Sequence, residues 1–234
     1  MPKTILVVDD DASIRDAVAI YMKREGHDVV QAKNGVEALE VFNRQHLDLV
    51  ILDVMMEGYN GFEVCSAIRD KDISLPIIIL SAKDDLVDKG LGFKLGADDY
   101  ITKPFEPAEL VMRANSCLRN RSPQEAEAEP QAGGGGSVIT LGDLSIDVDT
   151  RQVTVGNRRL DLTTKEYDIL LLMARRPNVV FTRQQILDSV WGYGYVGSSG
   201  VVAVFIRKLR EKIEADPSRP VHIITEWGVG YRIV

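Results

Sequence analysis

The chain of 234 residues is poor in several features that define whole classes of protein. It has only two cysteines, Cys65 and Cys117, in no metal-binding or disulfide spacing, which argues against a secreted scaffold held by disulfides. No apolar run approaches the roughly 18 residues that span a bilayer. Asp9 follows only four consecutive apolar residues, so we expect no secretory signal. The sequence therefore favours a globular protein of the cytoplasm that does not enter a membrane.

Charge and apolar residues are unevenly spread along the chain, whose formal net charge is −7. Residues 1–121 carry 15 Lys and Arg against 21 Asp and Glu, whereas residues 138–234 carry 13 against 11. Between them, residues 122–137 hold three glutamates, no base and a final run of four glycines and a serine. Such a segment cannot bury enough surface to order itself, so we predict a flexible linker between two domains. Its glycine run is equally typical of an engineered insert.

The segment before the linker alternates short apolar strands with amphipathic helices. The strands are expected at Ile5–Val8, Asp28–Gln31, Leu49–Leu52, Ile77–Leu80 and Tyr100–Thr102, and the helices near residues 13–25, 35–45, 62–70, 85–95 and 107–120. Asn34 and Pro107 are typical of helix starts. Five strand–helix units predict an α/β domain with a doubly wound, five-stranded parallel sheet of the flavodoxin type.

The segment after the linker follows a different pattern. We expect short strands within residues 138–162, helices that begin near Thr163, Thr182 and Val201, and a closing hairpin at residues 221–234. Thr163 and Glu166 form a capping box, and the helix that they open stops before Pro177. Three helices and a terminal hairpin predict a winged helix-turn-helix domain of the α+β class.

Polar side chains end four strands of the predicted parallel sheet. Asp9 and Asp10 end the first strand, Asp53 the third, Ser81 the fourth and Lys103 the fifth. Because functional side chains collect at the carboxyl ends of such strands, we expect three carboxylates, a hydroxyl and an ammonium to meet. Crowded carboxylates repel one another, so a hard divalent cation such as Mg²⁺ (or Mn²⁺) is expected among them. The chemistry that remains is capture of a phosphoryl group by a carboxylate oxygen.

The motifs VVDDDASIR, LVILDVMM, IIILSAKD and GADDYITKPF resemble, in order and spacing, the signature blocks of the receiver domain of two-component response regulators. This resemblance implies that a histidine kinase transfers a phosphoryl group to Asp53. It also implies that Mg²⁺ is bound by Asp10, Asp53 and the backbone carbonyl of Met55, with Asp9 assisting through water.

The resemblance implies further roles around the same pocket. Ser81 and Lys103 would contact the phosphoryl oxygens, and Ser81 and Tyr100 would be the switch positions that move on phosphorylation. The bond between Lys103 and Pro104 is expected to be cis. One departure stands beside the pocket, because Glu57 occupies a position where the family usually has proline, and a charged loop there could alter the rates of phosphorylation or dephosphorylation.

A second interpretation makes the first acidic loop an enzyme site. Asp9-x-Asp11-x-Ser13 after an apolar strand also resembles the nucleophile loop of haloacid-dehalogenase-type phosphatases, with Asp9 phosphorylated and Asp11 as the acid. That interpretation leaves Asp53 and the GADDYITKPF block unexplained and supplies no substrate pocket. We therefore expect a regulator and not a metabolic enzyme.

The expected helix at Val201–Glu214 has an apolar stripe and a basic side. The stripe consists of Val202, Phe205, Ile206, Leu209 and Ile213. Arg207, Lys208 and Arg210 fall outside it, and we expect them on an exposed face where counterion release would favour DNA. Glu211 also lies outside the stripe, so a merely solvated face is the alternative.

Three segments, LDLTTKEYDILLLMARRPNVVFTRQQILDSVWG, FIRKLREKIE and ITEWGVGYRI, resemble the winged-helix effector domain of the OmpR/PhoB family. This resemblance implies a recognition helix at about 200–213, phosphate contacts from Thr182 and Arg183, and a wing tip near Trp227 that approaches a minor groove. The implied partners are double-stranded promoter DNA and, on the promoter, RNA polymerase.

The chain departs from that family at the proposed DNA contacts. It has Gly200, Ala203 and Phe205 in a segment where the family usually reads Arg-Thr-Val-Asp-Val-His, and Trp227 stands at a common arginine position. These changes remove polar groups that relatives often use on phosphates. We expect weaker or altered DNA affinity but not lost binding.

The resemblance also implies a homodimer that forms on phosphorylation. Matching positions supply two charge pairs across that interface, Lys89 with Glu109 and Asp99 with Arg113. A dimer would place two basic helices on a repeated half-site of DNA.

Overall fold

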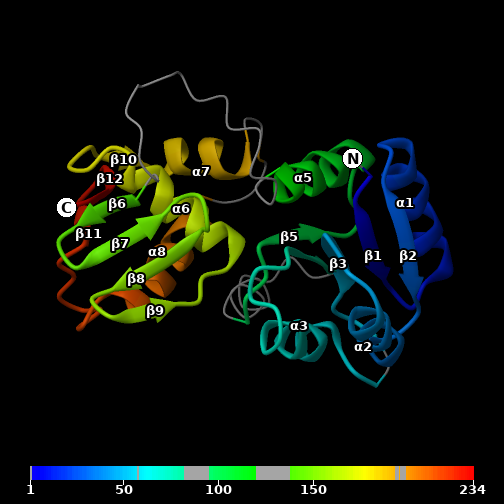
Figure 1. Ribbon diagram of the computed structural model, residues 1–234. Coiled ribbons are helices and arrows are strands. Elements are labelled where there is room, and N and C mark those ends of the chain that lie inside the picture. The colour runs from blue at the N-terminus through cyan, green and yellow to red at the C-terminus, as the bar shows by residue number, and fades with distance from the viewer. Residues whose placement is uncertain (1, 57, 82–94, 120–137, 193–194, 196–198) are drawn as a thin grey trace. The chain divides into compact units, whose positions relative to one another are not determined.

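The computed structural model describes residues 2–56, 58–81, 95–119, 138–192, 195 and 199–234 (Figure 1). The chain divides into two compact units, residues 1–121 and 122–234, which are described separately. The linker expected at residues 122–137 and most of the helix expected near residues 85–95 lie outside the described residues.

The first unit is built on a parallel sheet. Its elements are β1 (Thr4–Val8), α1 (Ala12–Arg24), β2 (Asp28–Ala32), α2 (Gly35–Arg44), β3 (Leu49–Asp53), α3 (Gly61–Arg69), β4 (Ile77–Ser81), β5 (Asp99–Thr102) and α5 (Pro107–Arg119). The strand order is β2-β1-β3-β4-β5, and every neighbouring pair is parallel. The predicted doubly wound α/β fold is confirmed.

Helices cover both faces of this sheet, with α1 and α5 on one face and α2 and α3 on the other (Figure 1). On the first face, alternate strand residues pack against the apolar stripes of α1 and α5. The buried members are Ile5, Val7, Val18, Met22, Leu49, Ile51, Ile78, Leu80, Ile101, Leu110, Ala114, Cys117 and Leu118. Because both faces are covered, the central strands are apolar along their length and change to polar residues only at their ends.

Local signals in the sequence explain where these helices begin. The Asn34 side chain accepts a hydrogen bond from the Glu37 amide at 2.9 Å, which caps α2, while the Glu37 carboxylate accepts from the amide of Lys33. Pro107 is the first residue of α5, where no amide hydrogen is needed. The peptide bond between Lys103 and Pro104 is cis, as predicted.

In its described residues, the second unit combines two antiparallel sheets with three helices. Its elements are β6 (Val138–Leu141), β7 (Leu144–Asp147), β8 (Gln152–Val155), β9 (Arg158–Leu160), α6 (Thr164–Ala174), β10 (Phe181–Thr182), α7 (Arg183–Trp191), α8 (Gly200–Ile213), β11 (Ile223–Glu226) and β12 (Gly230–Ile233). One sheet has the order β6-β7-β8-β9 and the other β10-β12-β11. The predicted winged helix is confirmed, with β11 and β12 as the wing.

Side-chain caps begin α6 and α7, and apolar and aromatic packing holds α8. Capping boxes open α6 at Thr163 and α7 at Thr182. All five predicted stripe residues of α8 are buried, and the Phe205 ring packs on Trp191 with 5.4 Å between ring centroids. Phe205 is therefore a core residue and does not face a ligand. Among the described residues, no helix combines the length and apolarity that a membrane crossing requires.

Candidate functional sites

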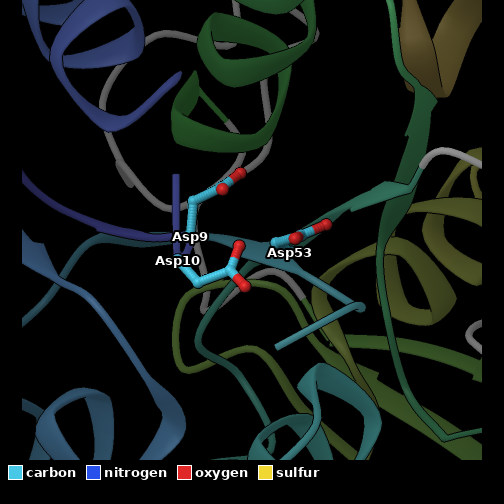
Figure 2. Close-up of side chains that lie close together, drawn as sticks. All are labelled: Asp9, Asp10 and Asp53. Carbon is cyan, nitrogen blue, oxygen red and sulfur yellow. The ribbon is translucent and has the colours of Figure 1, made fainter. Parts of the chain in front are cut away.

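Three carboxylates meet at the carboxyl end of the parallel sheet. Figure 2 shows Asp9, Asp10 and Asp53 side by side, and one oxygen from each lies within 4.8 Å of the others. The strand register brings Asp9 and Asp53 together, because Val8 of β1 lies opposite Leu52 of β3 and an aspartate follows each of them in the chain. Asp9 and Asp53 are buried, whereas Asp10 is exposed. The structure thus brings together the carboxylates that the sequence singled out.

Lys103 supplies the positive charge of this pocket. Its Nζ lies 2.6 Å from Oδ2 of Asp9 and 3.1 Å from Oδ1 of Asp53. The Lys103 amide donates a 2.7 Å hydrogen bond to the carbonyl of Ser81, which joins the ends of β4 and β5. The backbone of Lys103 is thus anchored at the end of β4, and its ammonium pairs with both buried carboxylates.

Burial dominates the protonation of Asp53. Removal from water raises the pKa of its carboxyl group, the positive charge of Lys103 opposes that rise, and the Asp9 carboxylate adds to it. The net direction is upward. The Oδ1 atom of Asp53 is buried and has no hydrogen-bond partner among the described residues, although the Lys103 ammonium is at ion-pair distance. A buried carboxylate oxygen in that state is suited to a further cationic or hydrogen-bonding partner.

The donor set fits a hard divalent cation. Asp9, Asp10 and Asp53 offer only oxygen, which Mg²⁺ and Mn²⁺ prefer, and their oxygens are close enough to share one ion. The exposed side chain of Asp10 leaves the cluster open to water, and Mg²⁺ usually keeps several water ligands. Met55 follows the end of β3 and has an exposed side chain. That its backbone carbonyl binds the metal ion stays a prediction.

Ser81 and Tyr100 lie on the strands next to the acidic cluster. Ser81 is the last residue of β4, opposite Thr102 of β5, and its side chain is fully buried. Tyr100 is 5% exposed, so its ring is inside the unit. Their roles as phosphoryl-binding and switch residues stay predictions. Glu57 lies outside the described residues.

Sequence reasoning assigned no role to Arg15, which supports the pocket from α1. Its Nη1 donates to the carbonyl oxygens of Asp9 at 2.7 Å and Asp10 at 3.1 Å. These bonds tie the peptide that carries two of the carboxylates to the first turns of α1. Arg15 ends the VVDDDASIR motif, and that position was the available signal.

The basic face predicted for α8 is only partly correct. Arg207 is exposed, with 81% of its side chain in solvent, and its Nε lies 2.9 Å from Oε1 of Glu211. Lys208 is only 14% exposed, because its ammonium turns toward the fully buried Glu166 on α6, at 3.7 Å. The prediction that Lys208 faces solvent was therefore wrong.

Arg210, also expected on the exposed face, is half-buried and makes contacts within the unit, and its contact with DNA stays a prediction. Its Nη2 donates to the carbonyl of Ile223 at 2.6 Å and to Oγ1 of Thr225 at 2.8 Å. The guanidinium thus fastens α8 to strand β11 of the wing. A long arginine side chain reaches across the groove between elements, which helical spacing alone does not reveal.

The other predicted DNA contacts lie at the surface of the second unit. Thr182 caps α7 by accepting a 3.1 Å hydrogen bond from the Gln185 amide. Arg183 is exposed, and its guanidinium carbon lies 5.5 Å from the centre of the Tyr231 ring. Trp227 lies in the turn between β11 and β12 and is 91% exposed.

Charged residues of the predicted dimer interface pair within the chain. Arg113 Nη1 lies 2.7 Å from Oδ1 of Asp99, and Nη2 lies 2.6 Å from Oε1 of Glu109. Lys89 lies outside the described residues. Pairing of these groups between two subunits stays a prediction.

Together, the parallel sheet with its acidic pocket and the winged helix define a class, the two-domain response regulators of two-component systems. Residues 5–115 match the family described as the response regulator receiver domain. Residues 157–233 match the family described as the C-terminal domain of transcriptional regulatory proteins. The chain belongs to the OmpR/PhoB family of these regulators.

Named relatives support this membership over nearly the whole chain. The DNA-binding response regulator MtrA of Mycolicibacterium paratuberculosis is 41% identical over 232 residues, which cover 99% of this chain and 98% of that protein. MtrA of Mycobacterium tuberculosis is also 41% identical, with coverage of 99% and 97%. Among solved structures, DrrB of Thermotoga maritima, an OmpR/PhoB homologue, is 33% identical with a TM-score of 0.53, covering 100% of this chain and 99% of that one. A point mutant of RitR has a TM-score of 0.77 at 27% identity and covers 99% of each chain.

Proposed function

We propose that Asp53 accepts a phosphoryl group from a histidine kinase and that its phosphorylation promotes dimerisation and promoter binding by the winged helix. The observation that carries this proposal is the buried Asp53 carboxylate, which lies at the carboxyl end of the central strand β3, close to an ammonium and two further carboxylates. Three carboxylates and one lysine at the carboxyl ends of parallel strands are typical of a site that transfers a charged group. A cluster of like charges does not by itself stabilise a fold.

The reaction needs an ionised Asp53. One of its oxygens forms a bond to phosphorus, the bond from phosphorus to the imidazole nitrogen of the kinase breaks, and the imidazole takes up a proton. Burial raises the pKa of Asp53, and the Lys103 charge works against that rise. Bound Mg²⁺, held by Asp9, Asp10 and Asp53, would neutralise charge on the transferred group.

Each chain group has a share in this step. Lys103 keeps its ammonium within ion-pair distance of both buried carboxylates and would pair with the arriving phosphoryl oxygens. Ser81 would donate a hydrogen bond to the same oxygens from the end of β4. Arg15 holds the carbonyls of Asp9 and Asp10, so that both carboxylates stay in position.

Labelling with a small acyl phosphate in the presence of Mg²⁺ tests the assignment. The unmodified protein should become phosphorylated, and Asp53→Asn should abolish the label. Asp11→Asn is the matched control, because Asp11 only caps α1 through the Ser13 amide and should leave labelling intact. Labelling that survives Asp53→Asn and disappears with Asp9→Asn would instead support a phosphatase of the haloacid-dehalogenase type, in which Asp9 is the phosphorylated residue.

We also propose that the second unit binds promoter DNA through a set of surface residues, namely Thr182, Arg183, Arg207 and Trp227. RNA polymerase is proposed as a further partner on the promoter. Arg207 and Arg183 are exposed cations on two neighbouring helices. Each phosphate contact adds close to one unit to the salt dependence of binding. A salt titration with selected duplex DNA tests this proposal, and a slope near zero would remove DNA from the function.

A further inference from the structure

A hollow of about 240 Å³ opens on the second unit between the start of α7, the side of α8 and the wing. Three arginines, Arg183, Arg207 and Arg210, line it together with Trp227, Tyr231 and Ala203, and its lining contains no acidic side chain. Its volume corresponds to about eight water molecules. The hollow therefore has room for a small anionic group.

The backbone around this hollow is fixed by strand pairing. Thr182 of β10 lies opposite Gly230 of β12, which joins the wing to the residue that caps α7. A side chain at residue 230 would collide with the carbonyl oxygen of Phe181, so only glycine permits this pairing. The distance between the wing and the N-terminus of α7 is therefore fixed by this strand pairing.

Two of the three guanidinium groups are held in place by the protein. Arg210 donates to the Ile223 carbonyl and to Thr225 Oγ1, and Arg183 lies over the Tyr231 ring. Among the residues that the structure describes, Arg207 pairs with Glu211, which is itself 49% exposed, and exposed pairs of this kind exchange partners at little cost. The hollow thus presents positive charge without a large loss of side-chain freedom on binding.

Trp227 stands at the rim of this hollow with 91% of its surface in solvent. The turn that carries it is closed by a 3.0 Å hydrogen bond from the Val229 amide to the Glu226 carbonyl, and Gly228 takes a φ of 76°. The neighbouring Glu226 carboxylate is paired with Arg232 at 2.6 Å, so its charge is balanced within the wing. An exposed, uncharged indole beside three arginines suits a partner that is both anionic and flat or apolar.

We propose that this hollow seats one backbone phosphate of duplex DNA and that Trp227 packs against the adjacent deoxyribose as an uncharged contact. DNA fits because its backbone alternates a phosphate with an apolar sugar face at short range. The inference rests on the proposed DNA binding and specifies how the wing takes part in it. A contact without charge releases no counterion, so Trp227 adds affinity that salt does not weaken.

The test measures affinity against salt concentration for the full-length protein and one duplex selected by the unmodified protein from a random pool. Trp227→Ala should weaken binding about tenfold at every salt concentration and leave the slope unchanged, as expected for loss of one apolar packing contact. Trp227→Phe should recover most of the loss, and Trp227→Arg should steepen the slope by about 0.9. Arg207→Ala is the charge control and should make the slope shallower by about 0.9.

Fluorescence gives an independent readout, since the chain has two tryptophans and Trp191 is only 1% exposed. The difference between the unmodified protein and Trp227→Phe isolates the emission of Trp227, which iodide should quench in the free protein and not in the complex. Unchanged affinity of Trp227→Ala, or equal quenching with and without the duplex, would overturn the proposed contact while DNA binding itself stands. Absence of salt-dependent binding by the unmodified protein would instead overturn the proposed function.

Discussion

At the scale of single residues, the acidic pocket combines groups that oppose one another. Asp53 is buried beside Asp9, and both effects disfavour its charge, whereas Lys103 favours it. The pocket is thus stabilised by whatever brings further positive charge to these carboxylates. This conflict is expected at a site selected for chemistry, because a carboxylate kept only for stability would be better paired or better solvated.

The raised pKa of Asp53 predicts a pH-dependent stability difference between the unmodified protein and Asp53→Asn. Below the ordinary carboxyl pKa both folded and unfolded Asp53 are protonated, so its contribution is fully present there. As the pH rises toward the folded pKa, the unfolded chain loses its proton first, and the contribution of Asp53 to stability is lost. Asp53→Asn does not titrate and should therefore gain stability relative to the unmodified protein over that window.

Urea unfolding of both proteins across mildly acid to neutral pH, without divalent cations, measures this difference. Addition of Mg²⁺ at neutral pH should stabilise the unmodified protein more than Asp53→Asn, because the ion would bind the folded acidic cluster. A stability difference that is constant over pH would contradict the assigned protonation of Asp53.

At the scale of elements, the second unit depends on a buried charged group that joins two helices. The Glu166 carboxylate on α6 accepts from the Thr163 amide at 2.9 Å and lies 2.6 Å from Nζ of Lys212 on α8. Lys208 contributes to the same cluster. The helix that carries the exposed Arg207 is therefore positioned by charge as well as by its apolar stripe.

Glu166→Gln should destabilise the second unit by about 2 kcal/mol, because the amide leaves two lysines without their buried counter-charge. Glu211→Gln is the matched control, since its partner Arg207 is exposed and the pair contributes about 0.5 kcal/mol at most. Denaturant unfolding followed by tryptophan emission measures both. Equal stability of the two variants would show that the buried charge has no such role.

Two glycines of the wing predict that Gly230→Ala is less stable than Gly228→Ala. Backbone conformation alone would predict the opposite order, because Gly228 has a positive φ. Gly228 has a positive φ of 76° with open space around it, so Gly228→Ala should cost about 1 kcal/mol. Gly230→Ala should cost about 3 kcal/mol or more, because the added carbon meets the backbone of β10. Thermal unfolding of both variants tests the order, which a lower melting temperature for Gly228→Ala would refute.

At the scale of the whole molecule, the proposed function requires two units with different charge to influence one another through a segment whose composition predicts no structure. Asp99 and Arg113, expected across a dimer interface, are paired inside the receiver unit. If these groups also pair across a dimer interface, one of two things must happen on phosphorylation. Either they pair within and between subunits at once, or the buried pair inside the unit rearranges. Simultaneous binding of two linked winged helices would then raise their effective concentration at a second half-site.

This scheme predicts that the linker can be lengthened at little cost. A phosphoryl mimic such as beryllofluoride with Mg²⁺ should shift the protein to a dimer in sedimentation and tighten binding to a duplex with two half-sites. Doubling residues 122–137 should weaken that binding by less than about threefold, because closure entropy grows slowly with length. A gain that disappears in the lengthened protein would show that coupling depends on direct contact between the units.

Much of the architecture is encoded locally and could be predicted from the sequence. Apolar strands that end in Asp9, Asp53, Ser81 and Lys103 predict the parallel sheet and its polar edge, because strand periodicity and the position of strand ends are local properties. The capping boxes at Thr163 and Thr182 likewise mark helix starts without tertiary information.

Only the tertiary structure decided how the long charged side chains are used. Helical spacing placed Lys208 and Arg210 on an exposed face, but Glu166 attracts one and the wing backbone binds the other. Arg15 likewise binds carbonyl groups, and its place at the end of the VVDDDASIR motif does not reveal those partners. A flexible side chain can reach several elements, and its partner depends on which buried acceptor the fold brings nearest. The sequence thus determined where the sheet ends and the helices begin, and the packing of those elements determined which charges remain available for function.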